Sequence, residues 1–353
     1  MLFVDLDNSL IKSDYLYESF VNYFSKNVLA PFICLFVYSR YGKVGLKKFL
    51  YEKSDISVIN LPYNEKVLNF IKDWKKKYPV ESIYLISASY NQVVDDIAQH
   101  LNCFDGAHGS NNQNIKSHTK LKKINELTDD KIFSYIGDSI DDLIIWENAK
   151  KCILVNPSKN LIKKVKKINP SIEVITNKEI ITLKEILKTI RVHQWVKNAL
   201  LFVPAILALE PLFYISESLI VGFFAFSFTA SAFYIFNDLF DIENDRNHHS
   251  KKYRSFASGT LSILHGFFIF CLLMFAAMIL ALNLPQSFQI CLILYVTLSF
   301  LYSKYLKKIP ILDIFILSYL YLIRIISGGV LVGIDISNWL LTFSVFFFLF
   351  LAS

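Results

Sequence analysis

Charged residues are scarce in this sequence. Asp, Glu, Lys and Arg make up 19% of its 353 residues, whereas an average soluble protein has roughly 25%. This shortage argues against an ordinary soluble protein, and a hydrophobic share of 54% with 31 Phe and 19 Tyr excludes a disordered chain. The five cysteines have an odd count and no CxxC spacing, so we expect reduced structural thiols. The first residues lack the basic end and long apolar core of a signal peptide, and we expect a buried strand there.

Charge is also unevenly distributed along the chain. From Asn198 to Ser353 there are only 8 Lys and Arg and 8 Asp and Glu, so all of the formal charge of +7 lies in residues 1–197. A basic part with ordinary charge content is thus followed by a neutral, strongly apolar part. This contrast predicts a soluble domain followed by a membrane domain, which agrees with the two domains that the length suggests.

The apolar part divides into six candidate membrane spans. A helix needs about 20 apolar residues to cross the hydrocarbon core of a bilayer, and most of the runs reach or approach this length. The six runs cover residues 198–213, 217–236, 260–283, 287–302, 311–332 and 338–352. We therefore expect an all-α, multi-spanning bundle in this half of the chain.

The loops between these spans alternate in charge. Lys and Arg occur before the first span (Lys184–Lys197), after the second (Arg246–Arg254) and after the fourth (Lys304–Lys308), and the three alternate loops have none. The positive-inside rule then places the basic loops and the N-terminal domain in the cytosol, so we expect a multi-pass protein of the inner (cytoplasmic) membrane. Residues Leu183–Trp195 mix apolar and basic residues at helical spacing, which predicts an interfacial helix ahead of the first span.

The loop after the second span is acidic. It holds Asn237, Asp238, Asp241 and Asp245 ahead of a Lys/Arg run. On one continuous helix, with about 100° per residue, the three Asp side chains would fall within roughly 60° of one another. Because Mg²⁺ binds one or two carboxylates together with phosphate oxygens, this face suits a magnesium–diphosphate complex, with the basic run holding the remaining phosphate charge. The alternative is a solvated interfacial loop with scattered charge.

Two charged residues lie inside the fifth candidate span. Asp313 and Arg324 are eleven residues apart, which is close to three helical turns, so both would face the same side of a helix. Ionisable residues inside a membrane are candidates for function. The alternative is an interfacial Asp313 and a structural Arg324 paired to another helix.

These motifs resemble those of a known family of membrane enzymes. The patterns NDxxDxxxD at 237–245 and KxRxxxxG at 252–259 are similar to the first Asp-rich motif of the UbiA superfamily of intramembrane prenyltransferases. Three further strings are similar to the branch of decaprenyl-phosphate phosphoribosyltransferases: RVHQWVKN at 191–198, YSxxLKxxPxLD at 302–313 and LxRxxxG at 322–328. That branch moves a phosphoribosyl group from phosphoribosyl pyrophosphate to a polyprenyl phosphate.

The resemblance covers roughly residues 188–353 and implies roles for the matched residues. It implies that Mg²⁺ and the diphosphate leaving group are held by Asn237, Asp238, Asp241 and Asp245, and that substrate is bound by Lys197, Asn198, Lys252, Arg254, Asp313 and Arg324. The sequence departs from the family at Ser255, where proline is usual. Family members have nine spans and a second polar motif. This sequence has six predicted spans and lacks that second motif. The resemblance therefore implies a fragment, or a chain that is not a working transferase by itself.

The soluble part alternates apolar strands with helical stretches. Strands are expected at residues 2–5, 83–87, 133–137, 152–156 and 171–176, and helices near 65–77, 91–101, 118–127 and 140–149. This alternation predicts an α/β fold with a doubly wound parallel sheet. Polar side chains follow several strands, where the active sites of open α/β sheets lie.

These strand ends resemble the haloacid dehalogenase (HAD) phosphatase superfamily, over about residues 1–178. The matching elements are Asp5 and Asp7, Ser87, a lysine, and Asp138 with Asp142, in that order. The resemblance implies that Asp5 is the nucleophile and Asp7 the general acid and base, and that Ser87 and Lys116, or alternatively Lys120, hold the phosphoryl oxygens. It further implies a Mg²⁺ ion bound by Asp5, Asp7, Asp138 and Asp142. The alternative is a plain α/β domain whose strand-end acids are only solvated.

A cap is expected between the first strand and the next helix, at about residues 11–64. It includes the apolar stretch Val28–Tyr38, which is too short to span a bilayer. Two interpretations of this stretch are open. It is either a buried helix of the cap or a patch that dips into lipid.

Together these features predict a bifunctional membrane enzyme. Residues 1–178 would be the HAD-type phosphatase, 179–197 an interfacial linker helix and 198–353 the UbiA-type transferase domain. The expected cofactor is Mg²⁺, and the expected partners are a polyprenyl lipid, a phosphorylated or diphosphate small molecule and the lipid bilayer, with no nucleic acid. Two alternatives remain: an aromatic polyprenyltransferase that uses a polyprenyl diphosphate, and a membrane-anchored phosphatase whose spans are not catalytic.

Overall fold

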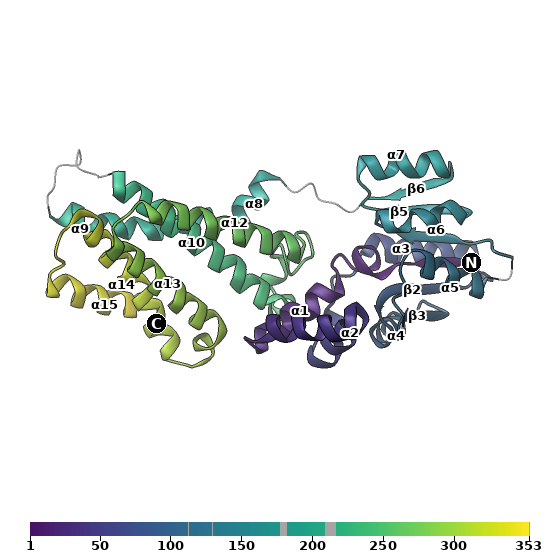
Figure 1. Ribbon diagram of the computed structural model, residues 1–353, viewed down its shortest axis with the longest axis horizontal. Helices are drawn as coiled ribbons and strands as arrows, with labels where there is room; N and C mark the ends of the chain where they lie inside the picture. Colours follow the sequence, from purple (N-terminus) through teal and green to yellow (C-terminus); the bar gives the residue numbers. More distant parts are fainter. Residues whose placement is uncertain (112, 129, 177–181, 209–216, 353) are drawn as a thin grey trace. The chain divides into compact units, whose positions relative to one another are not determined.

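The computed structural model describes residues 1–353 except 112, 129, 177–181, 209–216 and 353. The chain forms two compact units (Figure 1). The first unit comprises Met1–Ile181 together with Phe240–Ile263, and the second comprises Thr182–Leu239 together with Leu264–Ser353. The segment Phe240–Ile263, which follows the second predicted span, therefore belongs to the same unit as the N-terminal domain.

A six-stranded parallel sheet forms the centre of the first unit, with the strand order β3-β2-β1-β4-β5-β6. Its strands are β1 (Leu2–Val4), β2 (Ile83–Tyr90), β3 (Gly106–Ser110), β4 (Ser134–Gly137), β5 (Lys151–Val155) and β6 (Ile172–Ile175). Because β1 lies between β2 and β4, the residues that follow these three strands meet at one edge of the sheet. This order confirms the predicted doubly wound parallel sheet.

Helices cover both faces of this sheet. The helices α3 (Glu65–Lys77) and α4 (Asn91–Leu101) pack with Leu2 and Val4 of β1 in one hydrophobic cluster. On the other face, α5 (His118–Leu127), α6 (Leu143–Asn148) and α7 (Lys159–Ile168) pack around Phe3 and Trp146. The alternation of side chains along β1 explains this division, since neighbouring residues of a strand point to opposite faces.

Two helices form the cap between β1 and α3. They are α1 (Tyr15–Lys26) and α2 (Ala30–Lys53), which lie side by side and are followed by the short η2 (Val58–Asn60) (Figure 1). Tyr23 of α1 packs with Cys34 and Leu50 of α2 in a small buried cluster. Within α2 the backbone leaves helical geometry at Gly42, which has φ +65°, a conformation that glycine adopts without steric cost.

The segment Phe240–Ile263 packs on this cap. Its helix α11 (Ile242–Asn247) carries Arg246, whose two terminal nitrogens donate to the two carboxylate oxygens of Glu18 at 2.7 and 2.6 Å. The side chains of this ion pair are 7% and 4% exposed. The carboxylate of Glu243 accepts hydrogen bonds from Asn22 and from the backbone N–H of Ser57. Because a buried bidentate pair is costly to break, α11 and α1 form one rigid element.

The second unit is helical. Its elements are α8 (Leu183–Thr189), η4 (Val192–Phe202), α9 (Val203–Leu207), α10 (Glu217–Phe240), α12 (Ile263–Leu282), α13 (Gln286–Lys304), η7 (Leu306–Lys308), α14 (Leu312–Val332) and α15 (Asn338–Ala352). Among the described residues, α10, α12, α13 and α14 are long and apolar enough to cross a membrane. These four helices confirm the multi-spanning bundle.

The first and last of the six predicted spans differ from the prediction. The last forms α15, an apolar helix of 15 residues that is shorter than the other four. The first, at 198–213, begins in the 3₁₀ helix η4 and the short α9, and its final residues lie outside the described part of the chain. The linker is not one helix either, because Arg191 adopts a left-handed conformation with φ +54° that ends α8 before η4 begins.

Close packing of η4 on α14 explains one residue of the predicted motifs. A Cβ atom added to Gly328 would collide with the backbone carbonyl of Leu201 in η4. Only glycine allows this approach, because it has no side chain. The glycine of the motif at 322–328 therefore serves helix packing.

Candidate active sites

Three carboxylates meet at the edge of the sheet in the first unit. Asp5 follows β1 directly, Asp138 follows β4, and Asp142 lies in the 3₁₀ helix η3 (Ile140–Asp142). One oxygen of each lies within 4.8 Å of the others. The order of the strands thus brings together three of the four predicted metal ligands.

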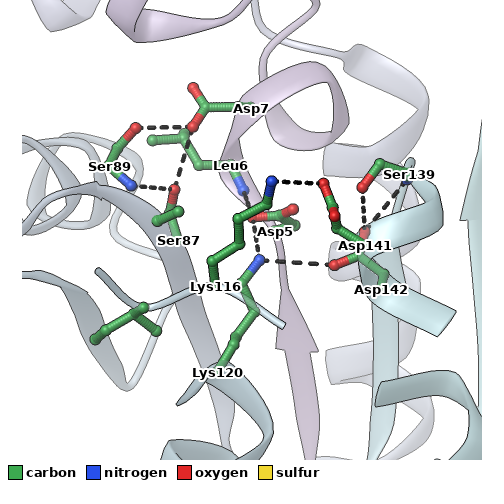
Figure 2. Close-up of polar contacts among 12 residues, drawn as sticks. Asp5, Leu6, Asp7, Ser87, Ser89, Lys116, Lys120, Ser139, Asp141 and Asp142 are labelled. Atoms are coloured by element: carbon green, nitrogen blue, oxygen red, sulfur yellow. Dashed lines mark hydrogen bonds and ion pairs between the residues drawn. The ribbon is translucent and has the colours of Figure 1, made fainter. Parts of the chain in front are cut away.

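Lys120 of α5 is the basic residue of this cluster. Its Nζ lies 2.9 Å from Asp5 Oδ1 and 3.8 Å from Asp142 Oδ1, and it donates to the hydroxyl of Tyr135 at 3.0 Å. Tyr135 in turn donates to Asp142 at 2.8 Å. Figure 2 shows Lys120 between Asp5 and Asp142. Since the Lys120 side chain is only 5% exposed, this ammonium group is fixed against the candidate nucleophile.

The negative charge of the three carboxylates exceeds the positive charge of the one lysine, so a further cation would stabilise the cluster. Burial raises the pKa of Asp5 to about 7, although Lys120 opposes the shift. Burial and the charges of Asp5 and Asp142 raise the pKa of Asp138 to about 8. One lysine thus cannot balance the charge of all three carboxylates when they are ionised, of which Asp5 and Asp142 are buried and Asp138 is half-buried. Mg²⁺ prefers carboxylate oxygens and would favour their charged forms, so these residues fit the predicted magnesium ion.

Asp7 lies among hydroxyl groups beside this cluster. Its carboxylate accepts hydrogen bonds from Ser89 Oγ at 2.7 Å, from Ser87 Oγ at 3.3 Å and from the backbone N–H of Tyr15 at 2.9 Å. Figure 2 shows Asp7 facing the two serines of β2. The carboxylate is therefore oriented by three donors, as a group that transfers protons requires. Ser87 lies where the resemblance implies.

The two candidate lysines have different environments. Lys116 pairs with Asp141 at 2.8 Å, and its side chain is 45% exposed. Lys120 contacts Asp5 and is buried. The geometry therefore favours Lys120, the alternative, over Lys116 as the lysine that holds the phosphoryl group. The reason is the helix: Lys120 lies in α5 and faces the sheet, whereas Lys116 precedes the helix.

We expect the two lysines to differ in their effect on phosphate ester hydrolysis. Lys120→Met should lower kcat/KM by at least about a hundredfold, since it removes a buried charge contact to the reacting group. Lys116→Met should lower it by less than about fivefold, since an exposed ion pair contributes little. The measurement is steady-state hydrolysis of a soluble phosphate monoester by both variants. Equal losses in both variants would contradict this assignment.

The cap contributes two charged residues to the same region. Lys47 of α2 donates to Asn114 Oδ1 at 3.1 Å and to the backbone carbonyl of Ala88 in β2. Burial lowers the pKa of Lys47 to about 8, against the opposing charge of Asp7. Burial also raises the pKa of Asp14 to about 7, and Asp7 adds to this shift. The charge of Asp7 thus acts on both Lys47 and Asp14 of the cap.

The acidic residues after the second span do not lie on one continuous helix. The helix α10 ends at Phe240, and α11 begins at Ile242, because Asp241 has φ −99° and ψ 9°. The prediction of a single helical face is therefore wrong, and the backbone turns where α11 packs on the cap. Asp241 and Asp245 remain on consecutive turns, since the N–H of Asp245 donates to the carbonyl of Asp241 at 2.7 Å.

Within the first unit, Asp245 is paired with a predicted substrate-binding residue. Arg254 donates to Asp245 Oδ2 at 2.8 Å, and the carboxylate is 3% exposed. Lys252 lies in the 3₁₀ helix η6 (Lys251–Tyr253), with its ammonium 5.2 Å from the ring centre of Tyr253. An acid and a base of the predicted diphosphate site are thus in direct contact.

Within the second unit, the other two acidic-motif residues contact basic side chains. Asp238 Oδ1 accepts from Arg191 at 2.5 Å, and its side chain is 8% exposed. Asn237 Oδ1 accepts from Lys307 at 3.1 Å. Both basic residues lie in strings that carried the resemblance, although neither was predicted to take part in the site.

Arg324 and Asn198 form a buried polar pair. Arg324 Nε donates to Asn198 Oδ1 at 2.7 Å, and another nitrogen donates to the Tyr295 hydroxyl at 3.1 Å. The ring of Tyr321 lies 5.3 Å from the Arg324 guanidinium and 5.6 Å from the Lys197 ammonium. Three predicted substrate-binding residues are therefore brought together.

Asp313 has a more local role. It lies in the first turn of α14 and accepts from the backbone N–H of Ile314 at 2.8 Å. The pairing of Arg324 with Asn198 and the place of Asp313 agree with the alternative stated for this pair. An arginine held across helices and a carboxylate at a helix start both have structural functions.

Several residues of these sites are difficult to recognise as site residues from the sequence alone. Ser89 could have been found from its spacing, because it lies two residues after Ser87 on the same face of β2. Lys47 has no local signal, since its approach to Asp7 depends on how the cap folds back. Tyr135 looks like an ordinary buried strand residue until its contact with Lys120 is known.

Comparison with known proteins agrees with this division of the chain. The model of the UbiA prenyltransferase family matches residues 199–353. The uncharacterized protein y4nM of Sinorhizobium fredii is 36% identical, over 99% of this chain and 68% of its own length. Residues 199–353 therefore form a domain of the UbiA prenyltransferase family. The chain is also similar to the decaprenyl-phosphate phosphoribosyltransferase of Corynebacterium glutamicum, with 33% identity over 47% of this chain and 52% of the relative.

The first half of the chain is similar to a different kind of protein. A solved structure of phosphoserine phosphatase in its apo form is 15% identical, with a TM-score of 0.36, and covers 53% of this chain and 96% of that chain. The chain spans about half the length of the Corynebacterium phosphoribosyltransferase.

Proposed function

We propose that the first unit is a Mg²⁺-dependent phosphomonoesterase. The observation that carries this proposal is the cluster of Asp5, Asp138 and Asp142, with the buried Lys120 in contact with Asp5. Mg²⁺ would be held by Asp5, Asp138 and Asp142 with the backbone of Asp7, and it would supply positive charge against the phosphoryl oxygens. The buried Lys120 supplies further positive charge at the same place.

The side chains support a two-step reaction. A carboxylate oxygen of Asp5 attacks phosphorus, the bond from phosphorus to the ester oxygen breaks, and Asp7 gives its proton to the departing alcohol. Asp7 then takes a proton from water, and the resulting hydroxide attacks phosphorus, which releases phosphate and restores Asp5. Lys120 and Ser87 hold the phosphoryl oxygens, and Ser89 orients Asp7.

We further propose that the UbiA domain transfers a phosphoribosyl group from phosphoribosyl pyrophosphate to a polyprenyl phosphate. The matched family, the similarity to phosphoribosyltransferases and the buried Asp238 of the second unit support this proposal. Mg²⁺ with the acidic residues would bind the diphosphate. The alternating loop charges support an inner-membrane location with the first unit in the cytosol.

The two activities are chemically related. A phosphoribosyl group carried by a lipid still has its 5-phosphate, which is a phosphate monoester. We therefore propose that the phosphatase unit removes this phosphate from the product of the transferase.

The test uses purified full-length protein with Mg²⁺ and two substrates, a polyprenyl-linked 5-phosphoribose and an unrelated soluble phosphate ester. We expect release of phosphate from the lipid-linked substrate with the higher kcat/KM. Hydrolysis of the soluble ester alone would exclude the coupling while leaving the phosphatase intact. Hydrolysis of neither would overturn the phosphatase proposal.

A further inference from the structure

The first half of α2 is apolar on two opposite faces, and the protein covers only one of them. Ala30, Cys34 and Val37 are buried, and Cys34 packs with α1. The opposite face is strongly exposed: the exposed fractions are 59% for Leu29, 72% for Phe32, 67% for Leu35 and 59% for Phe36. The apolar stretch predicted in the cap is therefore half buried and half exposed.

Such a face is costly in water. Four large apolar side chains at neighbouring helical positions form a continuous patch, which soluble proteins seldom leave uncovered. Covering apolar surface is favourable by about 25 cal/mol per Å². The patch therefore fits a surface that binds an apolar partner.

The charges around the patch indicate which partner it fits. No acidic residue occurs from Val28 to Tyr51. Arg40, Lys43 and Lys48 are all exposed on the same helix. Exposed aromatic and aliphatic side chains followed by basic residues match the boundary between acyl chains and anionic headgroups.

The connectivity of the chain brings this helix within reach of a membrane. Phe240–Ile263 packs on α1 through the buried Arg246–Glu18 pair and through Phe240, whose ring lies 4.9 Å from that of Phe24. This segment continues at one end from α10 and at the other into α12. Both are helices long and apolar enough to cross a bilayer. The cap is thus fastened to a short loop that enters the membrane at both ends.

We propose that the surface formed by Leu29, Phe32, Leu35 and Phe36 binds the lipid bilayer as an in-plane anchor of the cap. Arg40, which precedes the bend at Gly42, binds anionic headgroups beside it. Beyond the bend at Gly42 the same helix carries Lys47 to the catalytic edge of the sheet. The anchor therefore presents the phosphatase site to phosphate monoesters on lipids, and this last step rests on the proposed function.

The depth of the anchor can be measured on the full chain in vesicles that contain anionic lipid. The probe is a fluorophore on Phe32→Cys, and the matched control is the same fluorophore on Val80→Cys, which replaces another apolar residue of the same unit, 95% exposed. Both variants carry Cys271→Ser, because Cys271 is the exposed native thiol of the described residues, and the labelled Cys271→Ser protein gives the background.

We expect nitroxide-labelled lipids to quench the probe at position 32 several-fold more than the probe at position 80, and iodide to quench it less. Equal quenching by the nitroxide lipids at the two positions would overturn the proposal. In that case strong iodide quenching would show a solvated face, and weak iodide quenching would show a face covered by protein. This measurement does not depend on any enzymatic activity.

A second measurement tests the link to the substrate. Phe32→Asp with Phe36→Asp should lower hydrolysis of a vesicle-borne phosphate monoester roughly tenfold, since each lost apolar contact weakens membrane binding. Hydrolysis of a soluble ester should stay unchanged, which also shows that the variant folds. Unchanged hydrolysis of both esters would contradict the link. If wild-type protein hydrolyses neither ester, the proposed phosphatase function is wrong. The quenching of the fluorophore at position 32 still tests whether the cap binds the bilayer.

Discussion

Asp5→Asn is expected to abolish hydrolysis of phosphate monoesters. The amide keeps the size of the side chain and can still accept the backbone N–H of Leu6, which lies 2.9 Å from Asp5 Oδ1. It cannot, however, form an aspartyl-phosphate. Loss of a nucleophile has large effects, so we expect kcat to fall by roughly 10⁴-fold or more. The measurement is phosphate release from a soluble ester in the presence of Mg²⁺.

A matched control separates this loss from a general effect of removing a carboxylate. Asp73→Asn makes the same chemical change in the same unit, at a side chain that is 78% exposed and pairs with Lys76. It should leave kcat within about twofold of wild type, because exposed ion pairs contribute little. If Asp5→Asn retains more than a hundredth of the activity while folding normally, covalent catalysis by Asp5 is excluded.

The fold of the first unit could be predicted because its local signals agree. The helices expected at 65–77, 91–101 and 118–127 have these bounds in the structure. The strand β3 was not predicted, because Gly106–Ser110 contains two glycines and no long apolar side chain. It forms because the neighbouring edge of β2 supplies its backbone partners, which is a tertiary effect.

The acidic residues of the site could be predicted from the sequence more readily than the basic residues. Asp5, Asp138 and Asp142 follow strands of one parallel sheet, so topology alone brings them together. The choice of lysine depends on where α5 begins and on which of its side chains face the sheet, and Lys116 and Lys120 are only four residues apart in the sequence. Lys47 depends on the fold of the whole cap, for which the sequence has no periodic signal.

The acidic motif shows how packing overrides a helical pattern. Spacing alone places Asp238, Asp241 and Asp245 on one face of a helix, yet the backbone turns at Asp241. The turn allows Arg246 and Glu243 to contact the cap. Such contacts between segments more than 180 residues apart cannot be recognised from a local pattern.

Asp238→Asn is expected to weaken the binding of Mg²⁺–phosphoribosyl pyrophosphate by about a hundredfold. Asp238 is 8% exposed and pairs with Arg191 at 2.5 Å, so its charge is fixed in place before a ligand binds. An amide holds Mg²⁺ less well than a carboxylate, and losses of 10- to 100-fold or more are typical when a metal site is altered. The measurement is the protection that the ligand gives full-length protein against thermal unfolding in detergent.

Two comparisons make this result specific. Asp335→Asn replaces an exposed carboxylate of the same unit, in a predicted loop without Lys or Arg, and should leave the protection unchanged. Asp5→Asn should also leave it unchanged, whereas Asp238→Asn should leave phosphate ester hydrolysis intact, because the two sites bind different ligands.

Protection of wild type by a polyprenyl diphosphate in place of phosphoribosyl pyrophosphate would favour an aromatic prenyltransferase. A correctly folded Asp238→Asn protein with undiminished protection would remove the acidic motif from the donor site, and the membrane helices would then be an anchor for the phosphatase.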